Sequence, residues 1–318
     1  MKNKILLTGS TGFVGSAFTK RFKDSDCQLC PVVRHIKDDS PQNAIEVGDI
    51  DGNTDYSGAL SDVDVVLHIA ARAHIMKDES SDPLAEYRKV NVEGSENLAR
   101  QAAAAGVKRF VFISSVKVSG ESTTVKSPYT ELMQPAPEDA YGQSKYEAEG
   151  VLKQVAVDTG MEIVIIRPPL VYGSGVKANF LSLLKLSNLA VPLPFGVVHN
   201  NRSMVYVENL VDFIIRCIDH PKAANQTFLV SDGEDLSLKS LITYIRKAMG
   251  KSALLLPVPV GLFKLVGKLT GKSGVVDRLV GDLQVDSSKA RELLDWTPPY
   301  SVEQGIVATV LDFNNRKD

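Results

Sequence analysis

The chain is poor in cysteine, in tryptophan and in net charge. Its 318 residues include 3 Cys and 1 Trp, and 36 Lys and Arg against 38 Asp and Glu leave a formal net charge of −2. Three cysteines cannot build a disulfide framework, so a reducing compartment is expected. The near-neutral charge gives no global electrostatic case for nucleic-acid binding, and no nucleic-acid partner is predicted. No apolar run approaches the roughly 20 residues that cross a bilayer, so no membrane span is predicted.

Hydrophobic residues, by contrast, are plentiful. They make up 44% of the chain, enough for a sizeable core, while 23% of the residues are charged. The length corresponds to about two domains or to one large α/β unit. The first residues lead directly into an apolar run without a signal-peptide pattern, so a cytoplasmic location is expected.

Short runs rich in Val, Ile and Leu alternate with longer periodic stretches in the first half of the chain. These runs are apolar on both faces, which favours strands of a buried parallel sheet. The alternation predicts an α/β fold with a doubly wound parallel sheet of the Rossmann type. The predicted strands are Lys4–Thr8, Gln28–Val33, Ala44–Val47, Val65–Ile69, Phe110–Ser114 and Ile163–Arg167, and the predicted helices are Gly12–Lys23, Leu84–Ala105 and Tyr141–Thr159.

The composition of the chain changes after Arg167, where proline and glycine become frequent. Residues 1–167 are therefore predicted to form one domain around the sheet. Residues 168–318 are predicted to form a smaller C-terminal α/β substrate lobe, with some segments crossing back. The apolar stretch Leu254–Val266 contains Pro257, Pro259 and Lys264. We expect it to pack within the lobe rather than to contact a membrane.

Three glycines follow the first predicted strand, at the start of a predicted helix. Gly9 permits a tight turn, Gly12 lets the backbone approach a pyrophosphate, and Gly15 allows close contact between helix and sheet. The helix N-terminus offers unpaired N–H groups and a partial positive charge to an anion. The pattern predicts that residues 1–167 are the dinucleotide-binding domain.

A tyrosine and a lysine lie one turn apart at the start of the helix Tyr141–Thr159. The spacing of Tyr141 and Lys145 places both side chains on one face. A nearby ammonium group favours the phenolate, so Lys145 is expected to lower the pKa of Tyr141. Tyr141 would then move a proton on or off a substrate hydroxyl. On its own this spacing is weak, since such pairs recur on solvated helices.

Together, the G-x-x-G-x-x-G turn, the Tyr141-x-x-x-Lys145 pair and a serine after the fifth strand resemble the short-chain dehydrogenase/reductase superfamily. The resemblance is to its extended branch, the NAD-dependent epimerase/dehydratase family of nucleotide-sugar enzymes. It implies that Ser115 joins Tyr141 and Lys145 as a catalytic residue. It also implies cofactor contacts from Gly9, Thr11, Gly12, Phe13, Val14, Asp49, Ile50, Ala70, Ala71, Tyr141, Lys145, Pro168 and Val171.

The second strand ends at an arginine, where enzymes that prefer NAD usually have an acid. Arg34 would receive the 2′-phosphate of NADP, whereas a solvated arginine would leave NAD as the cofactor. The cofactor is therefore predicted as NADP or NAD, with a preference for NADP.

The resemblance also implies a substrate side made of cations and an aromatic loop. A nucleoside diphosphate carries about two negative charges, for which arginine offers planar bidentate donors. Lys117 stands where many relatives have Thr or Ala, and it faces either the substrate or the solvent. The predicted substrate-binding residues are Ser115, Lys117, Tyr141, Asn179, Phe195, Arg202 and Arg278.

The function predicted first is reduction or oxidation at sugar C4, interconverting a UDP-4-keto-6-deoxy-N-acetylhexosamine and its 4-hydroxy product for polysaccharide synthesis. The alternatives are a UDP-hexose or UDP-N-acetylhexosamine 4-epimerase with retained NAD, and a non-catalytic dinucleotide-binding sensor or scaffold. The partner is a UDP-sugar, with a homodimer as a further possibility. The lone pair Cys27 and Cys30 and the spacing of the five histidines predict no metal site.

Overall fold

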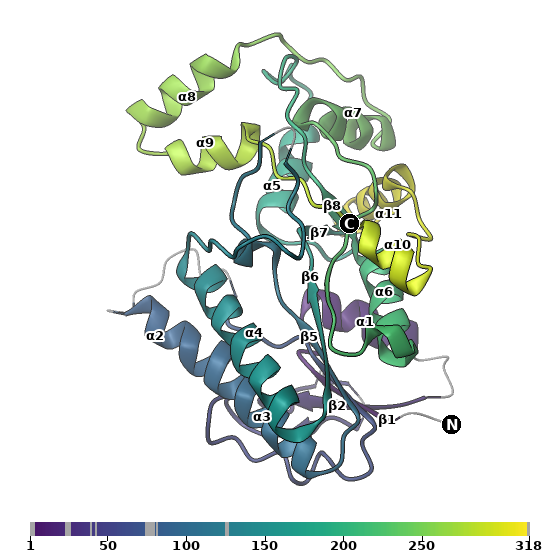
Figure 1. Ribbon diagram of the computed structural model, residues 1–318. Helices are drawn as coiled ribbons and strands as arrows, with labels where there is room; N and C mark the ends of the chain where they lie inside the picture. Colours follow the sequence, from purple (N-terminus) through teal and green to yellow (C-terminus); the bar gives the residue numbers. More distant parts are fainter. Residues whose placement is uncertain are drawn as a thin grey trace.

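The computed structural model describes residues 4–22, 27–38, 40–41, 43–73, 80, 82–124 and 127–316. In this part of the chain, seven parallel strands form one sheet in the order β3-β2-β1-β4-β5-β6-β9 (Figure 1). The predicted α/β fold with a doubly wound parallel sheet is confirmed. The strands are β1 (Lys4–Thr8), β2 (Gln28–Val33), β3 (Ile45–Glu46), β4 (Val65–His68), β5 (Arg109–Ile113), β6 (Glu162–Arg167) and β9 (Thr227–Leu229).

Both faces of the sheet are covered by helices, which explains why the middle residues of its strands are apolar on both faces. Ile5 and Leu7 of β1 pack into the core on one face, and Leu6 packs into the core on the other. The first face is covered by α1 (Phe13–Phe22), α6 (Val207–Asp219) and α10 (Ser288–Leu294). The second is covered by α3 (Gly94–Ala104) and α4 (Ala140–Thr159), with α2 (Pro83–Arg88) beside them (Figure 1).

The stretch predicted as one helix over Leu84–Ala105 is interrupted. A π-helical segment, Lys89–Glu93, separates α2 from α3. Its Asn91 is buried and bonds to the backbone of Arg72 through both the Nδ2 and the Oδ1 atom. Helical periodicity alone does not reveal such a bulge, since the residues on either side keep one buried face.

The C-terminal lobe has a small core of its own. It contains the parallel pair β7 (Leu170–Tyr172) and β8 (Met204–Tyr206), with α5 (Ala178–Ser187), α7 (Leu238–Ala248) and α11 (Val302–Asn315) around it. Two 3₁₀ turns lie elsewhere in the chain: Val116–Val118 follows β5, and Pro221–Ala223 connects α6 to β9. The buried Asp232 accepts hydrogen bonds from the Tyr172 hydroxyl and the Tyr206 N–H, which fixes β7 against β8.

Two helices at the end of this lobe, α8 (Val260–Leu269) and α9 (Ser273–Val280), correct an expectation for Leu254–Val266. Phe263 packs into the lobe as expected. Leu262, Leu265 and Val266 do not, since each is at least 50% exposed. Among the described residues, no helix is long and apolar enough to span a membrane.

Candidate active site

The turn between β1 and α1 needs glycine at two of its three predicted positions. Gly9 has a φ of +75°, and an added Cβ would lie 2.7 Å from the Ala70 nitrogen. At Gly15 an added Cβ would lie 2.0 Å from the Gly9 carbonyl oxygen, so α1 approaches the turn closely. Gly12 is less constrained, since its nearest atom would be 3.2 Å away.

The polar groups around this turn fit the diphosphate of a dinucleotide. Thr11 and Gly12 are exposed at the start of α1, with Phe13 and Val14 half-buried behind them. The Ser10 hydroxyl is buried and has no hydrogen-bond partner in the described part of the chain. An exposed helix start beside an unpaired hydroxyl group can receive an anion.

The remaining predicted cofactor residues lie at the carboxyl ends of the strands, where the ligands of such sheets bind. Arg34 follows β2, and its guanidinium lies 3.9 Å from the carboxylate of Asp49, with both side chains largely exposed. The backbone N–H of Ala70 donates to the Thr8 hydroxyl, which fixes the strand end after β4. Ile50, Ala71 and Val171 are half-buried, and Pro168 is buried.

A buried string of hydrogen bonds runs behind the cofactor turn. Thr8 Oγ1 lies 2.7 Å from His68 Nδ1, and His68 Nε2 lies 2.9 Å from Ser95 Oγ. Ser95 gives its proton to the Asn91 carbonyl oxygen, so His68 must donate from Nε2 and accept at Nδ1. Burial lowers the pKa of His68 to about 3, which keeps the ring neutral.

The string reaches the helix that carries the predicted acid and base. Asn91 Nδ2 donates to Ser144 Oγ at 2.9 Å, and Ser144 donates to the Tyr141 carbonyl oxygen at 2.8 Å. Sequence reasoning identified neither Asn91 nor Ser144. The only available signal was a polar residue within an otherwise amphipathic helix, which is not specific.

The three predicted catalytic residues come together where β5 ends and α4 begins. Ser115 follows β5, and its side chain forms a hydrogen bond with Tyr141 in the first turn of α4. Lys145, one turn further along α4, is 1% exposed. Its Nζ atom donates to the Ile113 carbonyl oxygen at 2.8 Å and lies 4.3 Å from the centre of the Phe112 ring.

The electrostatics of this group differ from the expectation. Burial raises the pKa of Tyr141, and the negative charge of Asp139 raises it further, while the Ser115 hydrogen bond opposes both. Burial lowers the pKa of Lys145 to about 7, although Glu149 opposes this shift. The predicted lowering of the Tyr141 pKa by Lys145 is therefore not seen in this state, because the lysine is directed to a backbone carbonyl.

A buried ion pair anchors the catalytic helix. Glu149 of α4 receives hydrogen bonds from Arg167 at 2.8 Å and 2.5 Å and from the Ser114 hydroxyl at 2.6 Å. Both charged groups are at most 3% exposed. Because Glu149 is one turn beyond Lys145, the pair fixes the position of α4 against β5 and β6. No local spacing marks this contact, since Arg167 lies 18 positions beyond Glu149.

Three of the predicted substrate-binding cations gather around one carboxylate. Glu121 receives hydrogen bonds from Lys117 at 2.7 Å and from Arg278 at 2.9 Å, and its charge also acts on Arg202. Lys117 pairs with Asp139 as well, and its side chain is only 16% exposed, so it is not a solvated residue. Sequence reasoning missed Glu121, whose only signal was an acid near predicted cations.

The other predicted substrate residues are less clearly part of this group. Asn179 is exposed at the start of α5, next to Ala178, whose φ of +51° is unusual for a residue with a side chain. Phe195 is 6% exposed and stacks on Phe263, with 5.5 Å between ring centres, so it packs in the lobe's core. His74, a further candidate for substrate contact, lies outside the described residues.

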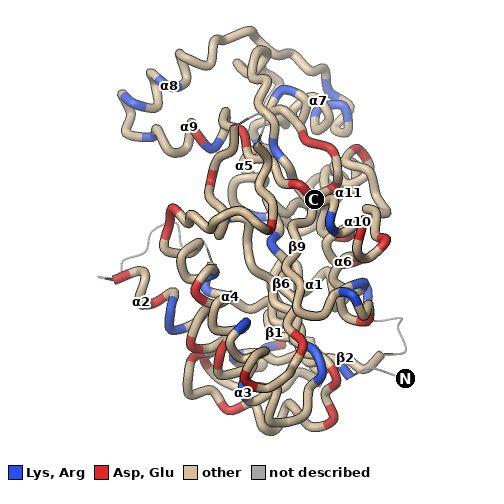
Figure 2. The backbone as a smooth tube through the Cα atoms, viewed as in Figure 1, with Lys and Arg blue, Asp and Glu red and all other residues tan. Residues whose placement is uncertain are grey.

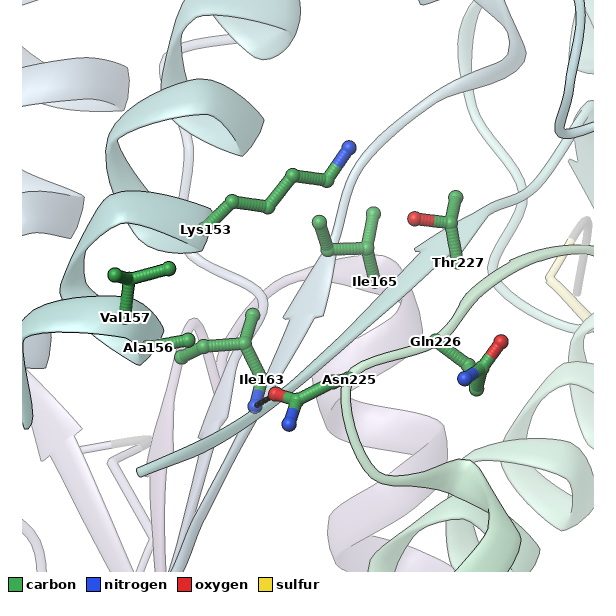
Figure 3. A pocket seen from close by; sticks show the side chains of 8 residues that line it. All are labelled: Lys153, Ala156, Val157, Ile163, Ile165, Asn225, Gln226 and Thr227. Atoms are coloured by element: carbon green, nitrogen blue, oxygen red, sulfur yellow. Dashed lines mark hydrogen bonds between the residues drawn. The ribbon is translucent and has the colours of Figure 1, made fainter. Parts of the chain in front are cut away.

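A hollow of about 430 Å³ lies elsewhere, between α4, β6 and the edge strand β9 (Figure 3). It contains none of the predicted site residues, and its lining is half aliphatic and half polar. The lining residues are Lys153, Ala156, Val157, Ile163, Ile165, Asn225, Gln226 and Thr227.

Comparison with known proteins tests the predicted family. Residues 5–231 match the model of the NAD dependent epimerase/dehydratase family. The chain belongs to this family. It is also 51% identical to a UDP-glucose 4-epimerase of Vibrio cholerae, over 99% of this chain and 98% of that protein. The predicted family and the prediction of an enzyme are thereby confirmed.

Two more distant proteins match nearly the whole chain, one in sequence and one in fold. The chain is 28% identical to the N-acetyl-alpha-D-glucosaminyl-diphospho-ditrans,octacis-undecaprenol 4-epimerase of Escherichia coli O157:H7, over 98% of this chain and 95% of that protein. The structure of a UDP-glucuronic acid 4-epimerase from Bacillus cereus in complex with NAD superimposes with a TM-score of 0.78 at 22% identity. That match covers 99% of this chain and 100% of the other.

Proposed function

We propose that this family member is a 4-epimerase of a UDP-linked hexose or N-acetylhexosamine that retains NAD. The observation that carries the proposal is the meeting of Ser115, Tyr141 and Lys145 at the carboxyl edge of the sheet that also carries the glycine turn. The Vibrio cholerae and Escherichia coli relatives are both named as 4-epimerases of sugars, which favours epimerisation over the net reduction predicted first.

The proposed chemistry needs a group that moves one proton at the C4 oxygen. Tyr141 accepts the proton of the C4 hydroxyl and returns it after the keto sugar has rotated to present its opposite face. Ser115 donates a hydrogen bond to the same oxygen. Bound NAD would supply reversible hydride transfer at C4. Lys145 holds the positive charge that favours the Tyr141 phenolate once it is released from the Ile113 carbonyl.

The cation group around Glu121 is the proposed diphosphate site. Lys117, Arg202 and Arg278 approach one another in the described structure, with Glu121 as their shared anion. A diphosphate offers more acceptor oxygens than one carboxylate, so it can replace Glu121 on Arg278, whose side chain is 55% exposed. Such an exchange would bring the sugar toward Tyr141.

NAD is proposed over NADP because of the surroundings of Arg34. The Asp49 carboxylate, 3.9 Å away, offsets the positive charge that would hold a 2′-phosphate. The preference for NADP drawn from Arg34 alone is not confirmed. The cofactor preference can be measured from the binding of NADH and NADPH to the wild-type protein and to Arg34→Ala. NADP would be the cofactor if the wild-type protein bound NADPH more tightly than NADH and Arg34→Ala weakened the binding of NADPH alone.

Analysis of the purified protein separates the two enzymatic readings. An epimerase releases NAD on denaturation and converts UDP-glucose or UDP-N-acetylglucosamine to the C4 epimer without added reductant. Stoichiometric consumption of NAD(P)H with a UDP-4-keto-6-deoxy-N-acetylhexosamine, and no epimerisation, would instead establish the reductase. In either case Tyr141→Phe should abolish turnover and leave nucleotide binding intact. Retained turnover in this variant would refute the role of Tyr141.

A further inference from the structure

Helix α8 presents an apolar stripe to the solvent. Leu262, Leu265, Val266 and Leu269 follow the i, i+3, i+4, i+7 spacing that places side chains on one face of a helix. A face of this kind is ordinarily buried in a core. Here the four side chains are 50%, 54%, 51% and 78% exposed. The loop before the helix adds Leu254 and Leu256, which are 57% and 50% exposed.

The opposite face of α8 already has its partners, so the stripe is not left over from poor packing. Phe263 stacks on Phe195 in the lobe's core. Gly267 is buried against α9, where an added Cβ would lie 2.8 Å from Val276 Cγ2. The two contacts hold α8 in one orientation and leave the leucine stripe exposed. The helix lies at the end of the lobe (Figure 1).

The charges beside the stripe have one sign. Lys264, Lys268 and Lys272 are exposed, and residues 260–276 contain no acid (Figure 2). Within the described part of the chain, none of the three lysines forms an ion pair. At 100° per residue, Lys264 and Lys268 fall between the stripe and the buried face. Their ammonium groups can reach the headgroups when the leucines enter a bilayer.

We propose that α8 docks this protein on the surface of an anionic phospholipid bilayer. The leucine stripe enters the boundary between headgroups and acyl chains, and the lysines contact lipid phosphates. With 10 residues, the helix is about 15 Å long and lies in the surface rather than across the bilayer. A second copy is a poorer occupant, because a two-fold interface would set the same lysines against one another.

Flotation with vesicles tests the proposal on the full chain. The wild-type protein should float with vesicles of phosphatidylcholine and phosphatidylglycerol, and less with phosphatidylcholine alone. Binding should weaken as the salt concentration rises. Lys264→Gln with Lys268→Gln should reduce partitioning by about 25-fold, since one lysine near an anionic surface contributes about fivefold. Leu265→Ser with Leu269→Ser should abolish it.

The matched control is Leu311→Ser on α11, where the leucine is 56% exposed but lies outside α8. This variant should bind vesicles as the wild type does, and all variants should retain thermal stability and conversion of a free UDP-sugar. An absence of wild-type binding to anionic vesicles would overturn the proposal. So would a dimer that dissociates in the Leu265 and Leu269 variant without any vesicle binding, because a second copy would then cover the stripe.

Discussion

Lys145→Met is expected to change how the stability of the protein depends on pH. The folded chain holds Lys145 with a pKa of about 7, against an ordinary value of 10.5, because the ammonium is buried. Between these two pH values the unfolded chain binds more protons at this residue, so the free energy of unfolding rises with pH. The difference corresponds to about 5 kcal/mol, at about 1.4 kcal/mol for each tenfold change in proton affinity. The methionine variant lacks this contribution.

Urea titrations at a series of pH values measure the effect. The single tryptophan, Trp296, is 5% exposed in the native protein and reports unfolding by fluorescence. The wild-type curve should rise more steeply than that of Lys145→Met between about pH 7 and pH 10.5. Lys185→Met, at an exposed position on α5, should keep the wild-type slope. Parallel curves for wild type and Lys145→Met would show that Lys145 stays protonated, and would refute the reasoning.

Three further predictions concern the parts that hold the site. Gly15→Ala should lower the free energy of unfolding by about 3 kcal/mol in thermal unfolding, because its Cβ overlaps a carbonyl oxygen, whereas Gly150→Ala, with open space around it, should not. Glu149→Gln should lower the free energy of unfolding in urea by about 3–5 kcal/mol, because it leaves the buried Arg167 unpaired. The double variant Glu149→Leu with Arg167→Leu should recover most of this loss, and additive losses would contradict a coupled pair. Burial raises the pKa of Asp139, but hydrogen bonds outweigh this and lower it. Asp139→Asn should therefore lose less stability than wild type as pH falls below about 3.8, as urea midpoints will show.

The sequence predicted the sheet well because buried parallel strands have a local signature. β1 and β2 have the predicted bounds, and β4, β5 and β6 differ by a residue at one end or both. The glycine turn and the Tyr141–Lys145 spacing were equally visible, since each depends on contacts within a few residues.

Contacts between distant segments were not predictable in the same way. The pairing of Glu121 with Arg278 joins residues 157 positions apart, and no local pattern marks it. The same holds for the stacking of Phe195 on Phe263. The family resemblance implied that Phe195 contacts the substrate, but its ring packs in the core of the lobe. The outward direction of the α8 stripe also depends on tertiary packing, because its spacing alone is typical of a buried face.

The last strand of the sheet has a consequence for how the protein could be divided. β9 pairs with β6, and α6 packs against α1, yet both follow residue 167 in the chain. A protein cut after Arg167 would yield a first piece with an open strand edge and with one sheet face covered only by α1. Neither piece would be complete, but each would hold the surface that the other needs. The two fragments are therefore suited to reassembly as a split enzyme, whose activity would report their association.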